Sequence, residues 1–295
     1  MRKVFMKNAK LNLIFAMLIF GSIGIFVRKI GLPSAQVALA RGIVGSFFLL
    51  LALKVAQQKI GWRTVRRNLP FLIGSGSIFG FNWVFLFKSY QYTSIANATL
   101  SYYCSPIFVM LLSPIVLKER LTLPKMLCVI SAMAGMFCIA RTGEKTGNGL
   151  FLGIAYGLAA AGLYAGVVLI NKFLKDLTAL ESTFFQLAIA TLAMLPYVLL
   201  SENLQFNTLD ASAWTLLAIV CVVHTGIAYI LFFGSIQKLQ GQTIAIFSYI
   251  DPMSAIVMST ILLNEKMEAL QIIGGILIIG AAFVSERLGK KQKQQ

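Results

Sequence analysis

Apolar residues follow one another along this chain in long runs that short polar or charged segments separate. Each run is close to the length of about 17 to 25 residues that an α-helix needs to cross the hydrocarbon core of a bilayer. The pattern therefore predicts an all-α integral membrane protein with ten transmembrane helices. We expect them at about residues 11–29, 34–54, 69–88, 94–117, 124–141, 149–171, 179–200, 212–235, 242–263 and 269–288.

The composition supports this pattern, because 58% of the 295 residues are hydrophobic, more than a soluble core requires. Ten helices joined by short loops leave no room for a soluble domain. The first apolar run has a basic flank but no small-residue cleavage site, and it leads directly into another run. We interpret it as a retained helix and not as a signal peptide.

The net charge of +16 would suggest a nucleic-acid partner in a soluble protein, but here the positions of the basic residues matter more. With the N-terminus inside, the expected cytoplasmic segments carry 19 Lys and Arg and the opposite segments carry six, while Arg41 lies within a helix. Because basic residues are enriched in cytoplasmic loops, we expect both termini in the cytoplasm, a lipid bilayer around the helices and no nucleic-acid partner.

The sequence also contains an internal repeat. A shift of 146 positions aligns residues 80–141 with residues 226–287 without a gap and gives 13 identities in 62 pairs. YCSP at 103 then faces YIDP at 249. The repeating unit is five helices long.

Because five is an odd number, the second copy must enter the membrane from the side opposite to the first. We therefore expect two inverted five-helix halves, residues 1–145 and 146–295, related by a pseudo-two-fold axis in the membrane plane. A site between such halves can be exposed to either side by similar movements, which is what a transporter requires.

With these features in hand, the chain resembles the drug/metabolite transporter superfamily, and specifically its ten-helix EamA-type branch. The resemblance covers essentially the whole chain. It rests on the two halves, on YTSIANATLSYYCSPIFVMLLSPIVLKERLT with Glu119 near its end, on the counterpart that ends at Glu265, and on Arg41 in the second helix. It implies a bacterial inner-membrane exporter or carrier of amino acids or other small metabolites, with a central cavity between the halves.

Two ionisable residues lie deep in the expected helices. Asp251 is the only charge in the run from Gln242 to Leu263, and it falls roughly 13 Å from the inner end of its helix, close to the midplane. Arg41 falls roughly 10 Å below the outer boundary. A charge at the helix centre costs about 2.5 to 3.5 kcal/mol, so each residue needs a partner or a function.

Several roles remain open for these two residues. Asp251 is a candidate to pair with Arg41, to be a satisfied buried acid, to bind a substrate ammonium group or to carry a coupling proton. Arg41 is a candidate to bind a substrate carboxylate. The resemblance supports an alternative for Arg41, because an arginine in this helix is typical of the family across many substrates and so fixes the architecture.

Asp251 and its counterpart in the first half, Ser105, each precede a proline. A proline removes a backbone donor, so we expect both helices to be interrupted where the halves meet. Small and polar residues share one helical face in each copy and are expected to line the cavity. They are Tyr102, Ser105, Val109 and Ser113, and Ser248, Asp251, Ala255 and Ser259.

Further candidate contacts come from one histidine, one amide and several aromatic residues. His224, the only histidine of the chain, has either a hydrogen-bonded packing role or a role in proton relay or substrate contact. The other candidates for the wall of a substrate site are Asn82, Trp83, Tyr102, Tyr103, Tyr229 and Tyr249. Tyr90 and Tyr92 fall near the outer boundary and are expected in the interfacial aromatic belt.

Other classes of protein are disfavoured by missing motifs. The sequence has no GxSxG elbow, HExxH helix, Walker A loop or dinucleotide fingerprint, which argues against an enzyme and against an ATP-driven pump. The four cysteines lack CxxC spacing, so we expect neither a disulfide framework nor a metal site, and no cofactor.

The sequence therefore predicts a secondary transporter for a small-molecule substrate, an exporter of amino acids or similar amphipathic metabolites, with a proton as a candidate coupling ion. The alternative is an exporter of cationic drugs or amines, which needs Asp251 and the tyrosines but has no use for Arg41.

Overall fold

The structure is a computed structural model that describes residues 8–93, 98, 101–119, 122–140, 150–201, 203–263 and 269–291. Within these residues it consists of helices and their connecting turns. The first half contains α1 (Ala9–Ile30), α2 (Ser34–Val55), α3 (Trp62–Tyr92), α5 (Ser105–Leu117) and α6 (Leu123–Ala140). The second half contains α7 (Leu150–Ile170), α8 (Ala179–Ser201), α9 (Ala211–Ile219), α10 (Ala228–Ile236), α11 (Gly241–Phe247), α12 (Ile250–Leu263) and α13 (Ala269–Lys291).

Three shorter elements complete the path of the chain. The 3₁₀ helices η1 (Asn171–Phe173) and η2 (Phe206–Thr208) lie in connections, and a π-helix, η3 (Val220–Ile227), joins α9 to α10. The expected all-α membrane fold is confirmed. The helix expected at 69–88 is longer than its apolar run, because the polar residues that precede the run continue the same helix as α3.

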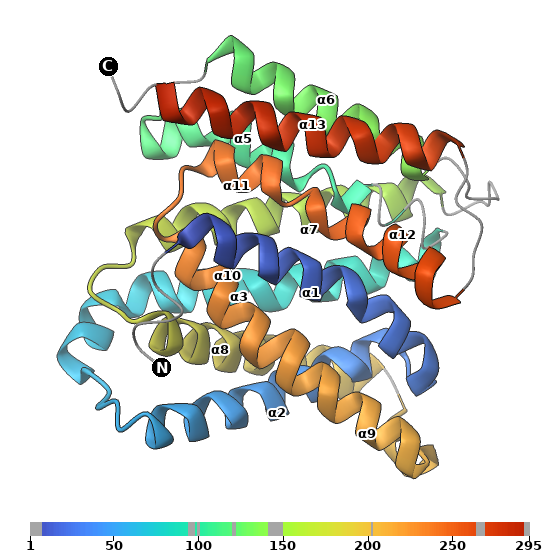
Figure 1. Cartoon of the computed structure of the whole chain (residues 1–295). Helices are drawn as coiled ribbons and strands as arrows, with labels where there is room; N and C mark the ends of the chain where they lie inside the picture. Colours follow the sequence, from blue (N-terminus) through green and yellow to red (C-terminus); the bar gives the residue numbers. More distant parts are fainter. Residues whose placement is uncertain are drawn as a thin grey trace.

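The helices lie side by side with their axes roughly along one direction, and the start of α1 and the end of α13 lie at the same end of the bundle (Figure 1). Contacts between helices occur in equivalent pairs. α3 packs on α7 as α10 packs on α1, and α5 packs on α7 as α12 packs on α1. The last helices of the two halves, α6 and α13, pair directly with one another. These matched contacts are what a pseudo-two-fold relation between the halves produces.

Helix ends follow local signals in the sequence. The side chain of Asn8 caps α1, and α1 ends at Gly31, whose φ of 76° is easily adopted by glycine. Pro33, two residues further on, is the N-cap of α2, which begins at Ser34. The carboxylate of Asp210 accepts a hydrogen bond from the N–H of Ala213 at 2.7 Å and thereby caps α9.

The interruptions that the prolines predict are present in both halves. The chain turns at Tyr103 and Cys104 before α5, and again at Ser248 and Tyr249 between α11 and α12. At the second break the carbonyl of Ile244 accepts from both the N–H and the hydroxyl of Ser248, at 2.9 and 2.8 Å. Irregular backbone at membrane depth is tolerated where protein surrounds it, and both breaks lie inside the bundle.

Small residues and buried polar side chains hold α3 against its neighbours. A Cβ atom on Gly80 would come within 2.5 Å of the carbonyl oxygen of Ala190 in α8, so the two backbones are in direct contact. On the other side of α3, the Ser89 hydroxyl donates to the carbonyl of Gly153 at 2.6 Å, and this residue belongs to α7. Close approach through small residues and interhelical hydrogen bonds are the usual means of helix association in lipid.

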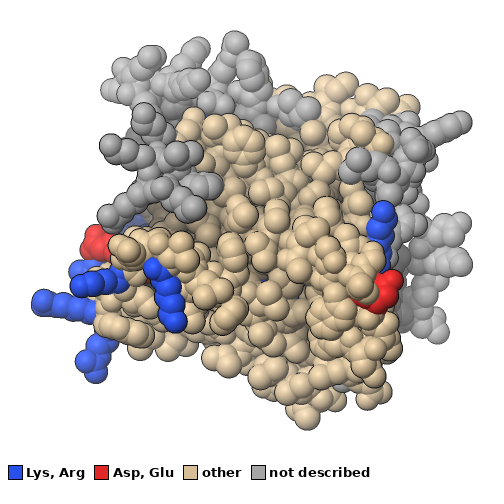
Figure 2. All heavy atoms as spheres, turned by 60° about the horizontal axis from the view of Figure 1, so that its bottom comes forward, with Lys and Arg blue, Asp and Glu red and all other residues tan. Residues whose placement is uncertain are grey.

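The outer surface of the bundle has the character expected of a protein in a bilayer. Six helices of the described part are long and apolar enough to cross a membrane. Large apolar side chains such as Phe47, Ile115, Phe151 and Leu200 are exposed. Figure 2 shows charged side chains only near the ends of the visible face, with a broad band of other residues between them. The chain is therefore a multi-pass membrane protein.

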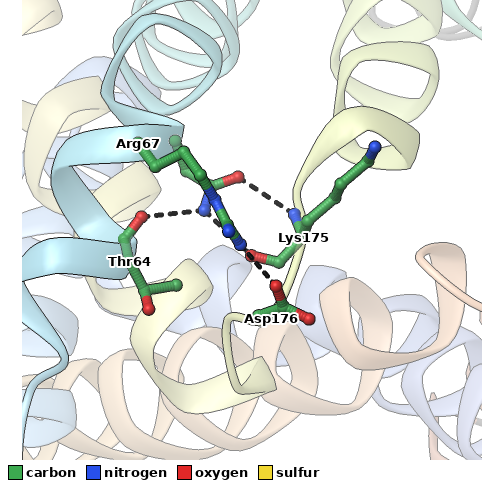
Figure 3. Close-up of polar contacts among 5 residues, drawn as sticks. Thr64, Arg67, Lys175 and Asp176 are labelled. Atoms are coloured by element: carbon green, nitrogen blue, oxygen red, sulfur yellow. Dashed lines mark hydrogen bonds and ion pairs between the residues drawn. The ribbon is translucent and has the colours of Figure 1, made fainter.

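Polar contacts fasten the start of α3 to the connection between α7 and α8. The Asn68 amide donates to the carbonyls of Thr64 at 2.8 Å and Lys175 at 2.9 Å, and its oxygen accepts from the N–H of Lys175 at 2.9 Å. Arg67 forms an ion pair with Asp176 beside them (Figure 3). These contacts join the two halves at this end of the bundle.

The close contact at Gly80 leads to a stability prediction. Gly80→Ala should lower the apparent melting temperature of the purified protein by about 3 to 8 °C, because the added methyl group forces α3 away from α8. Gly74→Ala is the matched control, since it lies in the same helix and its Cβ would meet nothing within 4 Å. Thermal unfolding in detergent measures both, and equal melting temperatures would contradict the packing described here.

Candidate functional site

Arg41 projects from α2 into a set of side chains from both halves. Its Nε donates to Thr225 Oγ1 at 2.9 Å, and Nη2 donates to the Tyr229 hydroxyl at a longer 3.5 Å. Its guanidinium carbon lies 5.5 Å from the centre of the Trp83 ring, a cation–π contact. Arg41 is only partly buried, and these two hydrogen bonds use Nε and Nη2.

The π-helix η3 supplies the acceptor for Arg41. The hydroxyl of Thr225 accepts from Arg41 and donates to the carbonyl of Val220, five residues earlier, at 3.1 Å. Gly45 lets α2 approach η3 closely, because a Cβ there would lie 2.8 Å from Cγ2 of Thr225. The corresponding residues of the first half, 74–81, belong to the regular helix α3. Single π turns within helices often mark functional sites.

The two aromatic residues beside Arg41 are equivalents in the internal repeat. The 146-residue shift that aligns the halves places Trp83 opposite Tyr229. One arginine thus contacts the same position of both halves, which puts it at their interface.

Asp251 lies near the start of α12, just after the break in the ninth transmembrane segment. The Tyr103 side chain, from the corresponding break of the first half, lies near its carboxylate. Against its other side, α1 makes a close approach, since a Cβ on Gly21 would lie 2.5 Å from the Asp251 carbonyl oxygen. The Asp251 side chain keeps part of its surface exposed.

Aromatic rings form a continuous path between Asp251 and Arg41. We call this path the aromatic chain. It runs from Tyr103 to Tyr102, Tyr164, Phe232, Phe233 and Tyr229, with successive ring centres 5.4 to 6.1 Å apart. Phe20 of α1 packs against both Tyr229 and Phe232 at 5.1 and 6.0 Å. Among the described residues, Arg41 and Asp251 form no ion pair with one another.

Other candidates are brought into this arrangement in supporting positions. The fully buried amide of Asn82 donates to the carbonyl of Ala160 at 2.7 Å and lies within reach of the Tyr102 hydroxyl. It therefore ties α3 to α7. Ser105 is buried at the start of α5. Lower on the same face, Val109 and Ser113 pack against Gly241 of α11, so this part of the expected cavity face is a helix contact.

His224 and Tyr249 lie outside the path from Arg41 to Asp251. The ring of His224 is 2% exposed, packs against Phe26 at 4.9 Å, and its Nε2 lies 2.9 Å from the Ser22 hydroxyl. The same hydroxyl lies 2.8 Å from the carbonyl oxygen of Ile19. Tyr249 is fully buried in the hydrophobic core. These contacts agree with the packing role for His224.

Five residues of this arrangement were missed from the sequence, namely Thr225, Tyr164, Phe232, Phe233 and Phe20. They are uncharged and lie in apolar helices, where they resemble packing residues. The π turn that positions Thr225 has no signal in a pattern of apolar residues.

Glu119, expected to make an interfacial or gating contact, caps another helix. Both of its carboxylate oxygens accept from the N–H of Gly241, each at 3.1 Å, at the start of α11. Beside it, Lys125 donates to the Gln240 side chain at 2.9 Å. The counterpart Glu265 lies outside the described residues. No group of three or more His, Cys, Asp or Glu side chains suited to a metal ion occurs among the residues described.

Comparison with known proteins agrees with this architecture. An uncharacterized transporter of Bacillus subtilis, YxxF, is 29% identical over 96% of this chain and 91% of its own length. A pseudopaline exporter of Pseudomonas aeruginosa, CntI, is 24% identical over 97% of this chain and 98% of its own. A solved crystal structure has the same fold, with a TM-score of 0.84 and 19% identity over 96% of this chain and 98% of that one.

The family model of EamA-like transporters matches the chain twice, at residues 8–141 and 151–286. These two matches cover both halves of the fold and almost the whole chain. The protein therefore belongs to the EamA-like transporter family, within the drug/metabolite transporter superfamily.

Proposed function

We propose that the protein is a secondary transporter that exports amino acids or similar small amphipathic metabolites by alternating access. The observation that carries the proposal is the separation of two charges. Arg41 and Asp251 belong to different halves, lie at opposite ends of the aromatic chain, and form no ion pair with each other.

Arg41 suits the carboxylate of such a substrate. A guanidinium has five N–H donors in a planar fork, and the contacts to Thr225 and Tyr229 use only Nε and part of Nη2. The remaining donors are free to form charge-assisted hydrogen bonds with a planar anion. The hydrogen bond from Nε to Thr225 orients the guanidinium, so that its other N–H groups point in a defined direction.

Asp251 suits the ammonium group of the substrate. A carboxylate accepts hydrogen bonds at about four positions, so the Asp251 carboxylate has acceptors for the three N–H donors of an ammonium group. An ammonium group beside it would offset the cost of a charge inside the membrane. When no substrate is bound, a proton is the simplest partner for the carboxylate, which makes Asp251 the candidate for coupling transport to a proton gradient.

The aromatic chain suits the apolar part of the substrate. Tyr102, Tyr164 and Phe232 offer ring faces and hydroxyl groups between the two charged ends. Rings of this kind pack against an aliphatic or aromatic side chain and also attract a cation. A substrate with one negative end, one positive end and an apolar body matches this arrangement.

The architecture supports movement between two states. We propose that the halves, residues 1–145 and 146–295, rock about the site, with the breaks before Ser105 and Asp251 as the points where the helices change direction. Inverted repeats with broken helices at the midplane are typical of secondary transporters. The mechanism requires no covalent chemistry, so we propose a transporter without enzymatic activity.

The location and direction follow from charge and from relatives. Basic side chains are numerous at the end of the bundle where α2 ends and α3 begins, and we propose that this end and both termini face the cytoplasm of a bacterial inner membrane. The exporter named among the relatives supports outward transport.

A second candidate is the export of cationic drugs or amines. It is supported by the rings around the site and by Asp251, which together form a setting for a cation. A cationic substrate would not use the remaining N–H donors of Arg41. We therefore favour a zwitterionic substrate over a cationic one.

The central test is counterflow in proteoliposomes. Purified protein should exchange a labelled amino acid from a mixed pool, with saturation, and Asp251→Asn should reduce this exchange by about tenfold or more because the charged partner is lost. The remaining activity of Asp251→Asn should be independent of pH between 5 and 8, in contrast to wild type.

Asp210→Asn is the matched control, because it makes the same chemical change at an exposed helix cap where Asn serves as well as Asp. It should exchange substrate like wild type. Unchanged rate and pH dependence in Asp251→Asn would contradict the role of Asp251.

Arg41→Lys should separate the two candidate substrates. Lysine keeps the charge but loses the fork, so exchange of amino acids should fall by about ten- to a hundredfold. Exchange of carboxyl-blocked amines should be unaffected if they bind through Asp251 alone. An equal loss for both kinds of compound would assign Arg41 to the architecture and not to the substrate.

Thr225→Val should raise the KM for amino acids by about three- to tenfold and leave kcat nearly constant, because it removes the acceptor that orients Arg41 while keeping the side-chain shape. Thr225→Ser should restore the wild-type value. Thr215→Val is the control, because Thr215 is exposed and its hydroxyl donates to the carbonyl of Ala211 in its own helix. A normal KM in Thr225→Val would show that Arg41 needs no such support.

A further inference from the structure

A basic surface lies where α2 ends and α3 begins, outside the arrangement around Arg41 and Asp251. Its exposed side chains are Lys54, Lys59, Arg63 and Arg66, and Trp62 stands among them. Residues 51–67 contain no Asp or Glu. We call these five residues the α2–α3 basic surface, and Figure 2 shows basic side chains projecting at one end of the molecule.

The acidic side chains nearest to this surface are already occupied. Asp176 pairs with the neighbouring Arg67, as Figure 3 shows. The carboxylate of Glu181 is buried and accepts from the N–H of Gly61 at 3.1 Å and from the N–H and hydroxyl of Thr178 at 3.0 and 2.9 Å. Among the residues that the structure describes, no acidic side chain pairs with the four basic members of the surface.

The surface is continuous with the lipid-facing side of α3. Trp62, Arg66, Leu69 and Ile73 follow the spacing i, i+4, i+7 and i+11, so they share one helical face, and all four are exposed. The apolar members Trp62, Leu69 and Ile73 are 68%, 41% and 49% exposed. An exposed apolar stripe on a membrane protein faces lipid, and Trp favours the boundary between lipid and water.

The position of Trp62 indicates the depth of the neighbouring basic residues relative to the bilayer. Its ring packs edge-on against Phe185 of α8 with ring centres 6.2 Å apart, so it is held in place at the start of α3. Arg63 and Arg66 lie within one turn of it and carry long stems that bring their guanidinium groups to the headgroup layer. A phosphate there would meet forked donors of matching geometry.

We propose that the α2–α3 basic surface binds the phosphate groups of anionic phospholipids at the edge of the bilayer. Charge complementarity and the exposed apolar stripe select this ligand over a soluble anion or a soluble protein, because neither of these would cover Trp62, Leu69 and Ile73. Arg67 takes no part, since Asp176 holds it.

Native mass spectrometry of the full-length protein tests this proposal directly. The Kd for phosphatidylglycerol is measured beside that for phosphatidylcholine in wild type and in Arg63→Gln/Arg66→Gln. Wild type should prefer phosphatidylglycerol, and the double variant should bind it about tenfold more weakly, as the loss of two basic residues at an anionic surface predicts. Lys29→Gln/Lys238→Gln removes the same charge from two exposed positions elsewhere and should keep the wild-type Kd.

Four outcomes would overturn the proposal. They are equal affinity of wild type for the two lipids, a wild-type Kd in Arg63→Gln/Arg66→Gln, an equal loss in the control variant, and displacement of phosphatidylglycerol by inorganic phosphate at the same concentration. Gel filtration and circular dichroism check folding. Should the double variant not fold, the single variants Arg63→Gln and Arg66→Gln decide, each with an expected loss of about threefold.

Discussion

Arg41 and Asp251 lie inside this membrane protein without pairing with each other. Each needs other polar or aromatic groups nearby to offset the free-energy cost of a charge in lipid. In lipid no water is present to solvate a charge, so local groups must do so. Arg41 is held by Thr225, Tyr229 and the face of Trp83, and the Tyr103 hydroxyl lies near Asp251. Arg41 and Asp251 form no ion pair with each other, and the zwitterionic substrate that we propose would give each of them a partner.

The inverted repeat provides this separation. Equivalent positions of the two halves supply Trp83 and Tyr229 on either side of Arg41, and the two broken helices bring Tyr103 and Asp251 together. The two halves differ at the positions around Arg41 and Asp251. The second half has a π turn where the first has a regular helix, and it has Asp251 where the first has Ser105. The two halves thus share the helix arrangement, and they differ at the π turn and at Asp251, two features of the proposed site.

The sequence predicted much of the frame, because lipid imposes length and polarity on every spanning segment. The ten segments, the repeat and the breaks before Ser105 and Asp251 were all visible in the pattern. The aromatic neighbours of the two charged residues, Trp83, Tyr229 and Tyr103, were also among the candidates from the sequence. Thr225, Tyr164 and Phe232 were not, because Thr225 is positioned by a π turn and the two rings meet only through the packing of helices far apart in sequence.

The most direct measurement of the central claim is a structure, determined by cryo-electron microscopy, of the protein with the substrate that it exchanges. The account predicts density between the halves, with the substrate carboxylate on the guanidinium of Arg41, its ammonium group on Asp251 and its apolar part against Tyr102, Tyr164 and Phe232. A substrate bound elsewhere, or one displaced by an ion pair between Arg41 and Asp251, would contradict it.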